Sequence, residues 1–215
     1  MGSLSRRSYN SPRRAASAEA TRTAIVAAAD AIFGSRGYAG TTLASIAERA
    51  GVSVATVKLT APTKSALLLE AFRARVRGVT GSAAASGRPA WQEMLEETDP
   101  VQLIRRWVSL TASTHEKTAP LFEVFWQAGP SEPELARMYE EASSNRRREF
   151  GRVVDALAAL SALRVGLDAA AAIDIAWVIN SPLTYRQVMG CGWTKDGWEE
   201  WMVSTMVDQL LAPVA

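Results

Sequence analysis

The sequence predicts an all-α protein, and three observations lead to that prediction. The 215 residues are 48% hydrophobic and 21% charged, a balance typical of a chain that folds around a sizeable core. Alanine is abundant and runs of β-branched residues are scarce, which favours helices over strands. Apolar residues also recur at helical spacing along most of the chain. We expect about nine to ten helices, divided between a three-helix head and a larger helical body.

The first helix is expected to begin near Ala18, after a basic, flexible tail of residues 1–17. Its apolar residues lie three and four positions apart and so share one face. These residues are Ile25, Ala28, Ala29, Ile32 and Phe33. Gly37 is expected to end the helix. The tail holds four arginines that either contact nucleic acid or stay solvated, namely Arg6, Arg7, Arg13 and Arg14.

Residues 41–64 predict two short helices joined by a tight turn. Thr42 can cap the first helix, and Gly51 follows it at the point where a left-handed residue most easily ends a helix. Ser53 can cap the second helix, and the small Ala47 lets the two helices cross closely. This is the helix-turn-helix pattern, over residues 41–60, in which the second helix lies in the major groove of DNA.

A fourth helix is expected from its cap Thr63 to about Val79, and the small, glycine-containing residues 81–90 indicate a boundary or long connection. In the body, Asp99 can cap a long helix, and Pro120 is expected to open a separate one. Ser131 and Glu134 form a capping-box pattern before another long helix. The remaining helices are expected over residues 91–97, 133–160, 169–180, 182–189 and 195–211.

Charge is distributed unevenly along the chain. The net charge is +2, but residues 1–78 hold 12 Lys and Arg against four acidic residues, which is +8 and leaves +2 − 8 = −6 for the rest. A basic N-terminal part and an acidic C-terminal part are typical of a domain that binds a polyanion followed by a domain that does not.

Several classes of protein are disfavoured by what the sequence lacks. Cys191 is the only cysteine, so no intrachain disulfide can form, and a cysteine-built metal site is not expected. With no secretory signal and no run of about 20 apolar residues, we expect a cytoplasmic protein. The chain has a single histidine and no nucleophile–base set, paired aspartates or phosphate loop, so we expect no enzyme, no catalytic residues, no metal and no cofactor. The acidic residues Glu96, Glu97 and Asp99 are interpreted as a helix start.

Residues 20–70 resemble the N-terminal domain of the tetracycline-repressor (TetR) family. The resemblance lies in the order and spacing of short sequence motifs along the head. They are Ile25-x-x-Ala28-Ala29-x-x-Ile32-Phe33, Gly37-Tyr38, Thr41-Thr42, Ile46-Ala47-x-x-Ala50-Gly51-Val52-Ser53, Thr56-Val57, and Lys64 followed by Leu67-Leu68. The later motifs are similar to the C-terminal helices of one subgroup. They are Pro120-Leu121, Asp174-x-x-Trp177-x-x-x-Ser181-Pro182-x-x-Tyr185, Gly192-Trp193 and Trp198-Glu199-x-Trp201.

This resemblance implies a homodimer in which each subunit has a DNA-binding head, residues 18–78, and a body, residues 79–215, that binds a small effector and forms the dimer. It implies a transcriptional repressor that its ligand releases from double-stranded operator DNA. Two other functions stay open: a DNA-binding regulator or activator that needs no ligand, and, remotely, a helical enzyme.

The DNA contacts divide into phosphate and base contacts. Thr41 and Thr42 at a helix N-terminus and Lys64 suit phosphate groups. The candidates on the second helix of the motif are Ser53, Val54, Ala55, Thr56, Lys58 and Leu59. This set is unusually apolar, so contacts with thymine methyl groups and DNA shape are expected to matter. The family often has Tyr, His and Phe where this chain has Lys58, Thr60 and Ala61, and Lys58 can replace the phosphate contact of that tyrosine.

Two further sets of candidates lie in the body. An apolar pocket for the effector is expected among aromatic residues, namely Trp107, Phe122, Phe125, Trp126, Tyr139 and Trp177, with His115, Gln127, Asn145 and Asn180 as polar groups. The aromatic residues can instead belong to the core, and His115 is more often a surface or hydrogen-bonded residue than a ligand contact. The dimer interface is expected on two helices, through Ile173, Trp177, Trp201, Met202 and Met206, unless these faces pack inside the subunit.

Overall fold

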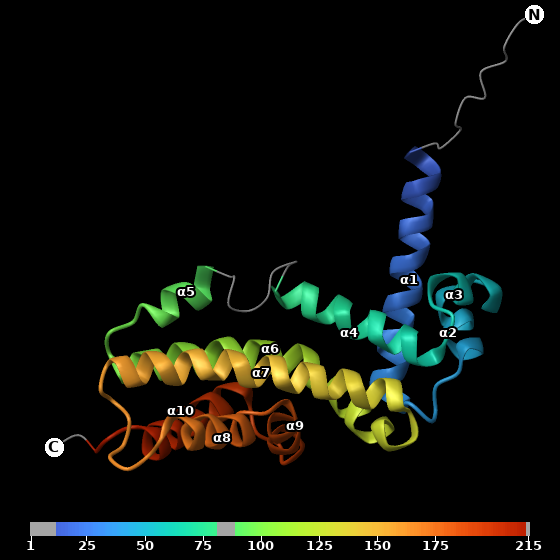
Figure 1. Cartoon of the computed structure of the whole chain (residues 1–215). Coiled ribbons are helices and arrows are strands. Elements are labelled where there is room, and N and C mark those ends of the chain that lie inside the picture. Colours follow the sequence, from blue (N-terminus) through green and yellow to red (C-terminus); the bar gives the residue numbers. More distant parts are fainter. Residues whose placement is uncertain (1–11, 81–88, 214–215) are drawn as a thin grey trace, which may run out of the picture. The chain divides into compact units, whose positions relative to one another are not determined.

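A computed structural model of the chain describes residues 12–80 and 89–213 (Figure 1). Within these residues the chain forms ten α-helices and one short 3₁₀ helix, and the β-structure amounts to one isolated bridge between Leu163 and Leu211. The all-α prediction is therefore confirmed. The chain divides between Ala71 and Phe72 into two compact units. Most of the predicted connection, residues 81–88, and the tail residues 1–11 lie outside the described residues.

The first unit is built from α1 (Pro12–Arg36), α2 (Leu43–Ala50), α3 (Val54–Thr60) and the start of α4 (Lys64–Thr80). Helix α1 begins at Pro12 and not near Ala18, so the last residues of the predicted tail are helical; proline is favoured in a first turn because its missing N–H is unpaired there anyway. Helices α1, α2 and α3 pack on one another. With the start of α4 they enclose a core of buried residues, namely Ile25, Val26, Ala28, Ala29, Ile32, Phe33, Ile46, Ala47, Val57, Ala61, Leu67, Leu68 and Ala71.

The predicted caps hold the turn between α2 and α3. Thr42 accepts a hydrogen bond from the Ser45 N–H at 3.0 Å, and Ser45 Oγ accepts one from the Thr42 N–H at 3.2 Å, so the two residues form a capping box. Gly51 ends α2 with φ +67°, a left-handed conformation that costs other residues about 1–2 kcal/mol. Val52 N–H then bonds Ala47 C=O at 3.0 Å, which completes a Schellman motif.

The second unit contains the rest of α4 and the remaining helices. Their bounds are α5 (Pro89–Leu95), α6 (Pro100–Ala128), the 3₁₀ helix η2 (Gly129–Ser131), α7 (Pro133–Ala159), α8 (Ala169–Ile179), α9 (Pro182–Gly190) and α10 (Lys195–Leu210). The long α6 packs against α5, α7, α9 and α10, while α8 packs against α7 and α10. The core of the unit therefore surrounds α6, and Trp107 and Trp198 are its largest fully buried side chains.

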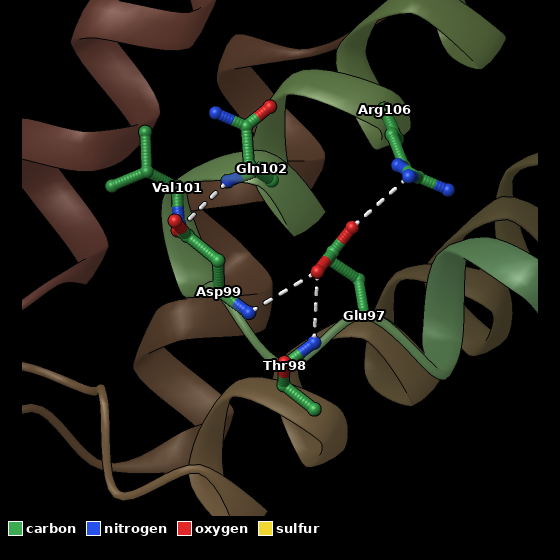
Figure 2. Close-up of polar contacts among 6 residues, drawn as sticks. All are labelled: Glu97, Thr98, Asp99, Val101, Gln102 and Arg106. Carbon is green, nitrogen blue, oxygen red and sulfur yellow. Dashed lines mark hydrogen bonds and ion pairs between the residues drawn. The ribbon is translucent and has the colours of Figure 1, made fainter.

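The acidic residues before α6 start the helix, as the sequence predicted (Figure 2). Asp99 Oδ1 accepts from the backbone N–H groups of Val101 and Gln102 at 2.8 and 3.1 Å. Glu97 accepts from the Thr98 N–H at 3.0 Å and pairs with Arg106 at 3.1 Å. Because both carboxylates are engaged in the cap and the preceding turn, this acidic group is structural.

One predicted helix boundary and one predicted helix cap in the body are wrong. Pro120 lies inside α6 and does not open a new helix. Buried residues continue on both sides of it, from Thr111 to Phe125, and their packing offsets the roughly 3 kcal/mol that an interior proline costs. Ser131 lies in η2, and the N-cap of α7 is Glu132, which makes no side-chain capping bond. Helix α7 begins at Pro133, as predicted, but Ser131 belongs to the 3₁₀ turn and the predicted capping box does not form.

No helix in the described ranges combines the length and apolarity needed to cross a bilayer.

Candidate functional site

One side of α3 faces away from the core of the first unit. Val57 and Ala61 point inward and are buried, whereas Val54, Ala55 and Leu59 are exposed. Lys58 is exposed on the same outward side and is the only charged residue of α3. The helix thus presents one cation among apolar side chains.

The hydroxyl groups around α3 serve its cap. Ser53 Oγ accepts from the Thr56 N–H at 3.1 Å and lies 2.8 Å from Thr56 Oγ1. Thr56 itself is half-buried. One of the two hydroxyls therefore donates to the other, and Lys58 Nζ is the one charged side-chain donor of α3.

The two threonines before α2 have different surroundings. Thr42 is exposed at the N-terminus of α2, where unpaired N–H groups favour an anion. Thr41 is only 1% exposed, and its hydroxyl donates to Gly37 C=O at 2.6 Å. A phosphate contact through the Thr41 side chain does not fit this burial, whereas one through Thr42 does.

Lys64 begins α4 with its ammonium group held in place. Lys64 Nζ donates to Tyr38 C=O at 3.0 Å and lies 4.0 Å from the centroid of the Tyr38 ring. Tyr38 in turn stacks on the buried Phe33, with centroids 6.1 Å apart. An ammonium group has three donors, so this geometry orients Lys64 and still leaves donors for an anion.

The six aromatic candidates for a pocket do not form one group. Phe122 lies 5.0 Å from Tyr139 between ring centroids, and Phe125 lies 5.1 Å from Phe72, so these four residues gather between α4, α6 and α7. Phe72 of α4, which was not among the predicted pocket residues, is part of this group.

The other three candidates have separate environments. Trp107 is fully buried and packs edge-on against Phe150, with centroids 4.8 Å apart. Trp177 lies under the guanidinium of Arg146, 4.9 Å from ring centroid to Cζ, and donates to Ser143 C=O. Trp126 is 54% exposed.

A buried polar network that sequence reasoning did not assemble lies beside α6. His115 Nε2 is 3.0 Å from Asn180 Oδ1, and Asn180 Nδ2 donates to Thr111 Oγ1 at 3.0 Å. Since Asn180 Oδ1 can only accept, Nε2 carries the proton, and Nδ1 is left without a hydrogen-bond partner among the described residues. His115 also lies 5.9 Å from the ring centroids of both Tyr185 and Trp198. The helical spacing of the sequence could have indicated that two members of this network are buried, because Thr111 and His115 fall in the apolar stripe of α6. Gln127 and Asn145, by contrast, are exposed.

Burial sets the charge of this network. Desolvation lowers the pKa of His115 from 6.5 to about 4, against a smaller opposing effect of its hydrogen bond to Asn180. Desolvation also lowers the pKa of Arg146 to about 10, yet its Nη1 donates to the C=O groups of Trp177 and Asn180 at the end of α8. At neutral pH the interior therefore holds a neutral imidazole and a cation stabilised by a helix C-terminus.

The buried histidine predicts a pH dependence of stability. Above pH 6.5 His115 is neutral in both the folded and the unfolded chain. Below pH 6.5 the unfolded chain takes up the proton first, because the pKa of His115 is lower in the folded chain. The free energy of unfolding therefore falls by about 3 kcal/mol between pH 6.5 and 4. Urea unfolding of the wild type and of His115→Gln, from pH 7 to pH 4.5, measures this, because His115 is the only histidine. The wild type should lose stability more steeply than the variant as pH falls. Parallel pH profiles of the two proteins would contradict the buried neutral imidazole.

The five candidates for the dimer interface also differ in exposure. Met202 and Met206 are fully buried in the body's own core, so they offer no surface to a second copy. Trp201 is half-buried and packs edge-on against the exposed Trp193, with centroids 5.9 Å apart. Ile173 and Trp177 face α7. The exposed residues of α8 include Asp174, which pairs with Arg147, and Val178, which is 59% exposed, while Ala171 and Ile175 are half-buried.

The described residues hold no cluster of three or more side chains that could bind a metal ion. Comparison with known proteins gives a match at the N-terminal end. Residues 25–71, which include α2, α3 and their turn, match the model described as "Bacterial regulatory proteins, tetR family". None of the curated proteins compared matches the sequence.

Solved structures share the whole architecture at low sequence identity. A putative transcriptional regulator from Saccharomonospora viridis, in complex with choline, is 18% identical with a TM-score of 0.72, over 91% of this chain and all of the other. NalD of Pseudomonas aeruginosa, the secondary repressor of the MexAB-OprM multidrug efflux pump, is 22% identical with a TM-score of 0.66, over 91% of this chain and 98% of the other. A putative TetR-family regulator from Mesorhizobium loti is 20% identical with a TM-score of 0.65, over the same shares. At these identities the likeness concerns the fold.

Proposed function

We propose that this chain, whose residues 25–71 match the tetR family of bacterial regulatory proteins, binds DNA and regulates transcription, as a repressor that a small ligand releases from its operator. The outward face of α3 carries this proposal. It is a capped helix at the position of a recognition helix, with a free cation and no acidic residue. We propose Thr42, Ser53, Val54, Ala55, Lys58, Leu59 and Lys64 as the contacts, with Thr42 and Lys64 on phosphates. The cytoplasmic location expected from the sequence stays a prediction.

Selection from a random DNA library tests the DNA-binding part of the proposal. The full chain is incubated with random duplexes of about 30 base pairs, long enough for two half-sites one helical turn apart. We expect a recovered sequence with two-fold symmetry, bound at least about a thousandfold more tightly than scrambled DNA. Recovery of no common sequence, with equal affinity for scrambled DNA, would overturn the proposal.

We propose a homodimer formed by the outward sides of α8 and α10, with Ile175, Val178 and Trp201 at its centre. Val178 and Trp193 are large apolar side chains left exposed in the isolated subunit, and burying such residues stabilises a contact by roughly 1.5–3 kcal/mol each. A two-fold contact buries each of these side chains once from each subunit, so the stabilisation from a small patch is doubled.

Replacing Val178 by glutamate is expected to weaken the dimer by on the order of a hundredfold, because two unpaired carboxylates would be buried against each other. Light scattering across a concentration series measures the dimer dissociation constant. Val165→Glu is the matched control, since Val165 is 94% exposed and lies between α7 and α8. If the Val178 and Val165 variants dimerise equally well, the interface lies elsewhere.

We propose that the effector is small and largely apolar and contacts the aromatic group Phe72, Phe122, Phe125 and Tyr139. These rings come from three helices of one unit. A ligand that contacts all three helices can favour one arrangement of them over another. The choline complex of the S. viridis structure supports adding alkylammonium compounds to the candidates, because aromatic faces also attract cations. Trp107, fully buried against Phe150, is assigned to the core and not to this site.

Effector binding can be tested by thermal shift with a panel of apolar aromatic compounds and choline, followed by DNA binding in the presence of each hit. A releasing effector should raise the melting temperature of the free protein and lower its affinity for the selected DNA. If compounds raise the melting temperature but leave DNA affinity unchanged, the ligand-independent regulator becomes the better description.

A further inference from the structure

The outward face of α3 is unusually apolar for a surface that is proposed to contact DNA. Leu59 is 89% exposed, the largest exposure of any large hydrophobic side chain among the described residues of the first unit. Ala55 lies one turn before it on the same side, and Val54, which is also exposed, is the first residue of the helix. The inward positions of the helix are already filled by Val57 and Ala61, so Leu59 adds little to the packing of the head.

The polar side chains that α3 offers for contacts with bases are correspondingly few. Ser53 and Thr56 bond each other through their hydroxyls, and α3 contains no Arg, Asn, Gln, Asp or Glu. Lys58 is its one charged donor. The side chains that most often distinguish bases by paired hydrogen bonds are therefore missing from this helix.

The major groove offers one kind of apolar group to such a face. Among the four bases only thymine carries a methyl group there, at C5, beside its O4 acceptor. A leucine or valine that covers this methyl removes apolar surface of both partners from water. An A·T pair can be recognised in this way with no hydrogen bond from the protein.

We propose that Leu59, together with Val54, determines operator specificity by packing on C5-methyl groups in the major groove. This inference rests on the proposed DNA-binding function and identifies the chemical group that is recognised. Thymines occupy the positions of each half-site that face Leu59 and Val54, and Lys58 contributes a contact to phosphate or guanine. Cytosine methylated at C5 presents the same methyl group and should substitute for thymine in contact with Leu59.

The test removes single methyl groups from DNA without changing its base pairing. The duplex recovered by selection with the full chain is resynthesised with deoxyuridine in place of thymidine, one symmetric pair of positions at a time. Each methyl buried against the protein should contribute about fourfold, so the sensitive pair of positions should lose about fifteenfold in affinity. Fluorescence anisotropy of the labelled duplexes measures the change.

Protein variants separate direct contact from an effect of the methyl group on DNA shape. Leu59→Ala should bind thymidine and deoxyuridine duplexes equally at the sensitive positions, and its exposed site lets it fold as the wild type does. Val165→Ala truncates an equally exposed apolar side chain in the second unit and should keep the full discrimination. A third duplex, with 5-methylcytosine·guanine at the sensitive pair, should be bound more tightly by the wild type than its unmethylated form.

The outcomes distinguish this inference from the proposed function. If Leu59→Ala loses the discrimination between thymidine and deoxyuridine and Val165→Ala keeps it, methyl recognition is supported. If binding is sequence-specific but no deoxyuridine substitution weakens it, methyl recognition is wrong and the DNA-binding function still stands. The same holds if both Leu59→Ala and Val54→Ala still discriminate between thymidine and deoxyuridine. Absence of any sequence-specific binding overturns the proposed function, and the inference with it.

Discussion

The Lys58→Glu variant is expected to bind the selected operator on the order of a hundredfold more weakly than the wild type, or worse. Lys58 is the only charged residue on α3 and is exposed on its outward side. One contact of a lysine with a phosphate or a base contributes about 1–3 kcal/mol, and a dimer makes it twice. Reversal of the charge adds repulsion between the new carboxylate and the phosphates. Anisotropy titrations of labelled operator at fixed salt measure the loss.

Arg152→Glu is the matched control for this variant. Arg152 is exposed on α7 in the second unit, so the variant has the same change in net charge without a change in α3. It should bind the operator nearly as the wild type does, apart from a small, salt-dependent effect of net charge. Equal losses in the two variants would mean that net charge alone, and not the face of α3, governs binding.

Replacing Trp107 by alanine is expected to destabilise the body by about 3–5 kcal/mol and lower its melting temperature by about 10 °C. The side chain is fully buried, and its edge-on contact with Phe150 would be lost together with its packing. Calorimetry of the full chain measures the change.

Trp126→Ala serves as the comparison, because Trp126 is 54% exposed on the same helix. Its effect on stability should stay within about 0.5 kcal/mol. If Trp107→Ala keeps the melting temperature and alters only the response to effector, then Trp107 lines the ligand site, as the sequence first suggested, and is not part of the core.

The parts of the fold that sequence predicted well are those set by short-range chemistry. Thr42, Gly51 and Ser53 each act within three or four residues of their own position, through a side-chain cap or a left-handed backbone. The alternation of buried and exposed residues on α3 follows from the same local period. These features locate the candidate DNA-binding face almost completely.

Predictions failed where long-range packing overrides a local signal. Pro120 is a strong helix breaker by itself, but the buried residues of α6 on either side of it hold the helix together. The hydroxyl of Thr41 was expected to be free for phosphate, yet the turn after α1 buries it against Gly37. Neither outcome is visible in a window of a few residues.

The interior of the body was hardest to anticipate, because its contacts join distant segments. His115 and Asn180 are 65 positions apart in sequence, and no spacing rule pairs them. The aromatic residues likewise separate into different groups according to how α4, α6, α7 and α8 pack. Composition predicted aromatic contacts in the body, but only the fold assigns each ring to the core, the surface or a candidate ligand site.

Hydroxyl-radical footprinting on the DNA that flanks the protein's own gene tests the central claim, that the α2–α3 unit of this chain binds specific double-stranded DNA through the outward face of α3. The wild type should protect two segments on one face of the duplex, with centres one helical turn or a multiple of it apart. Lys58→Glu should leave the same fragment uniformly cleaved at equal protein concentration. A footprint that is identical with both proteins, at the same positions and concentrations, would contradict the assignment of DNA recognition to this face.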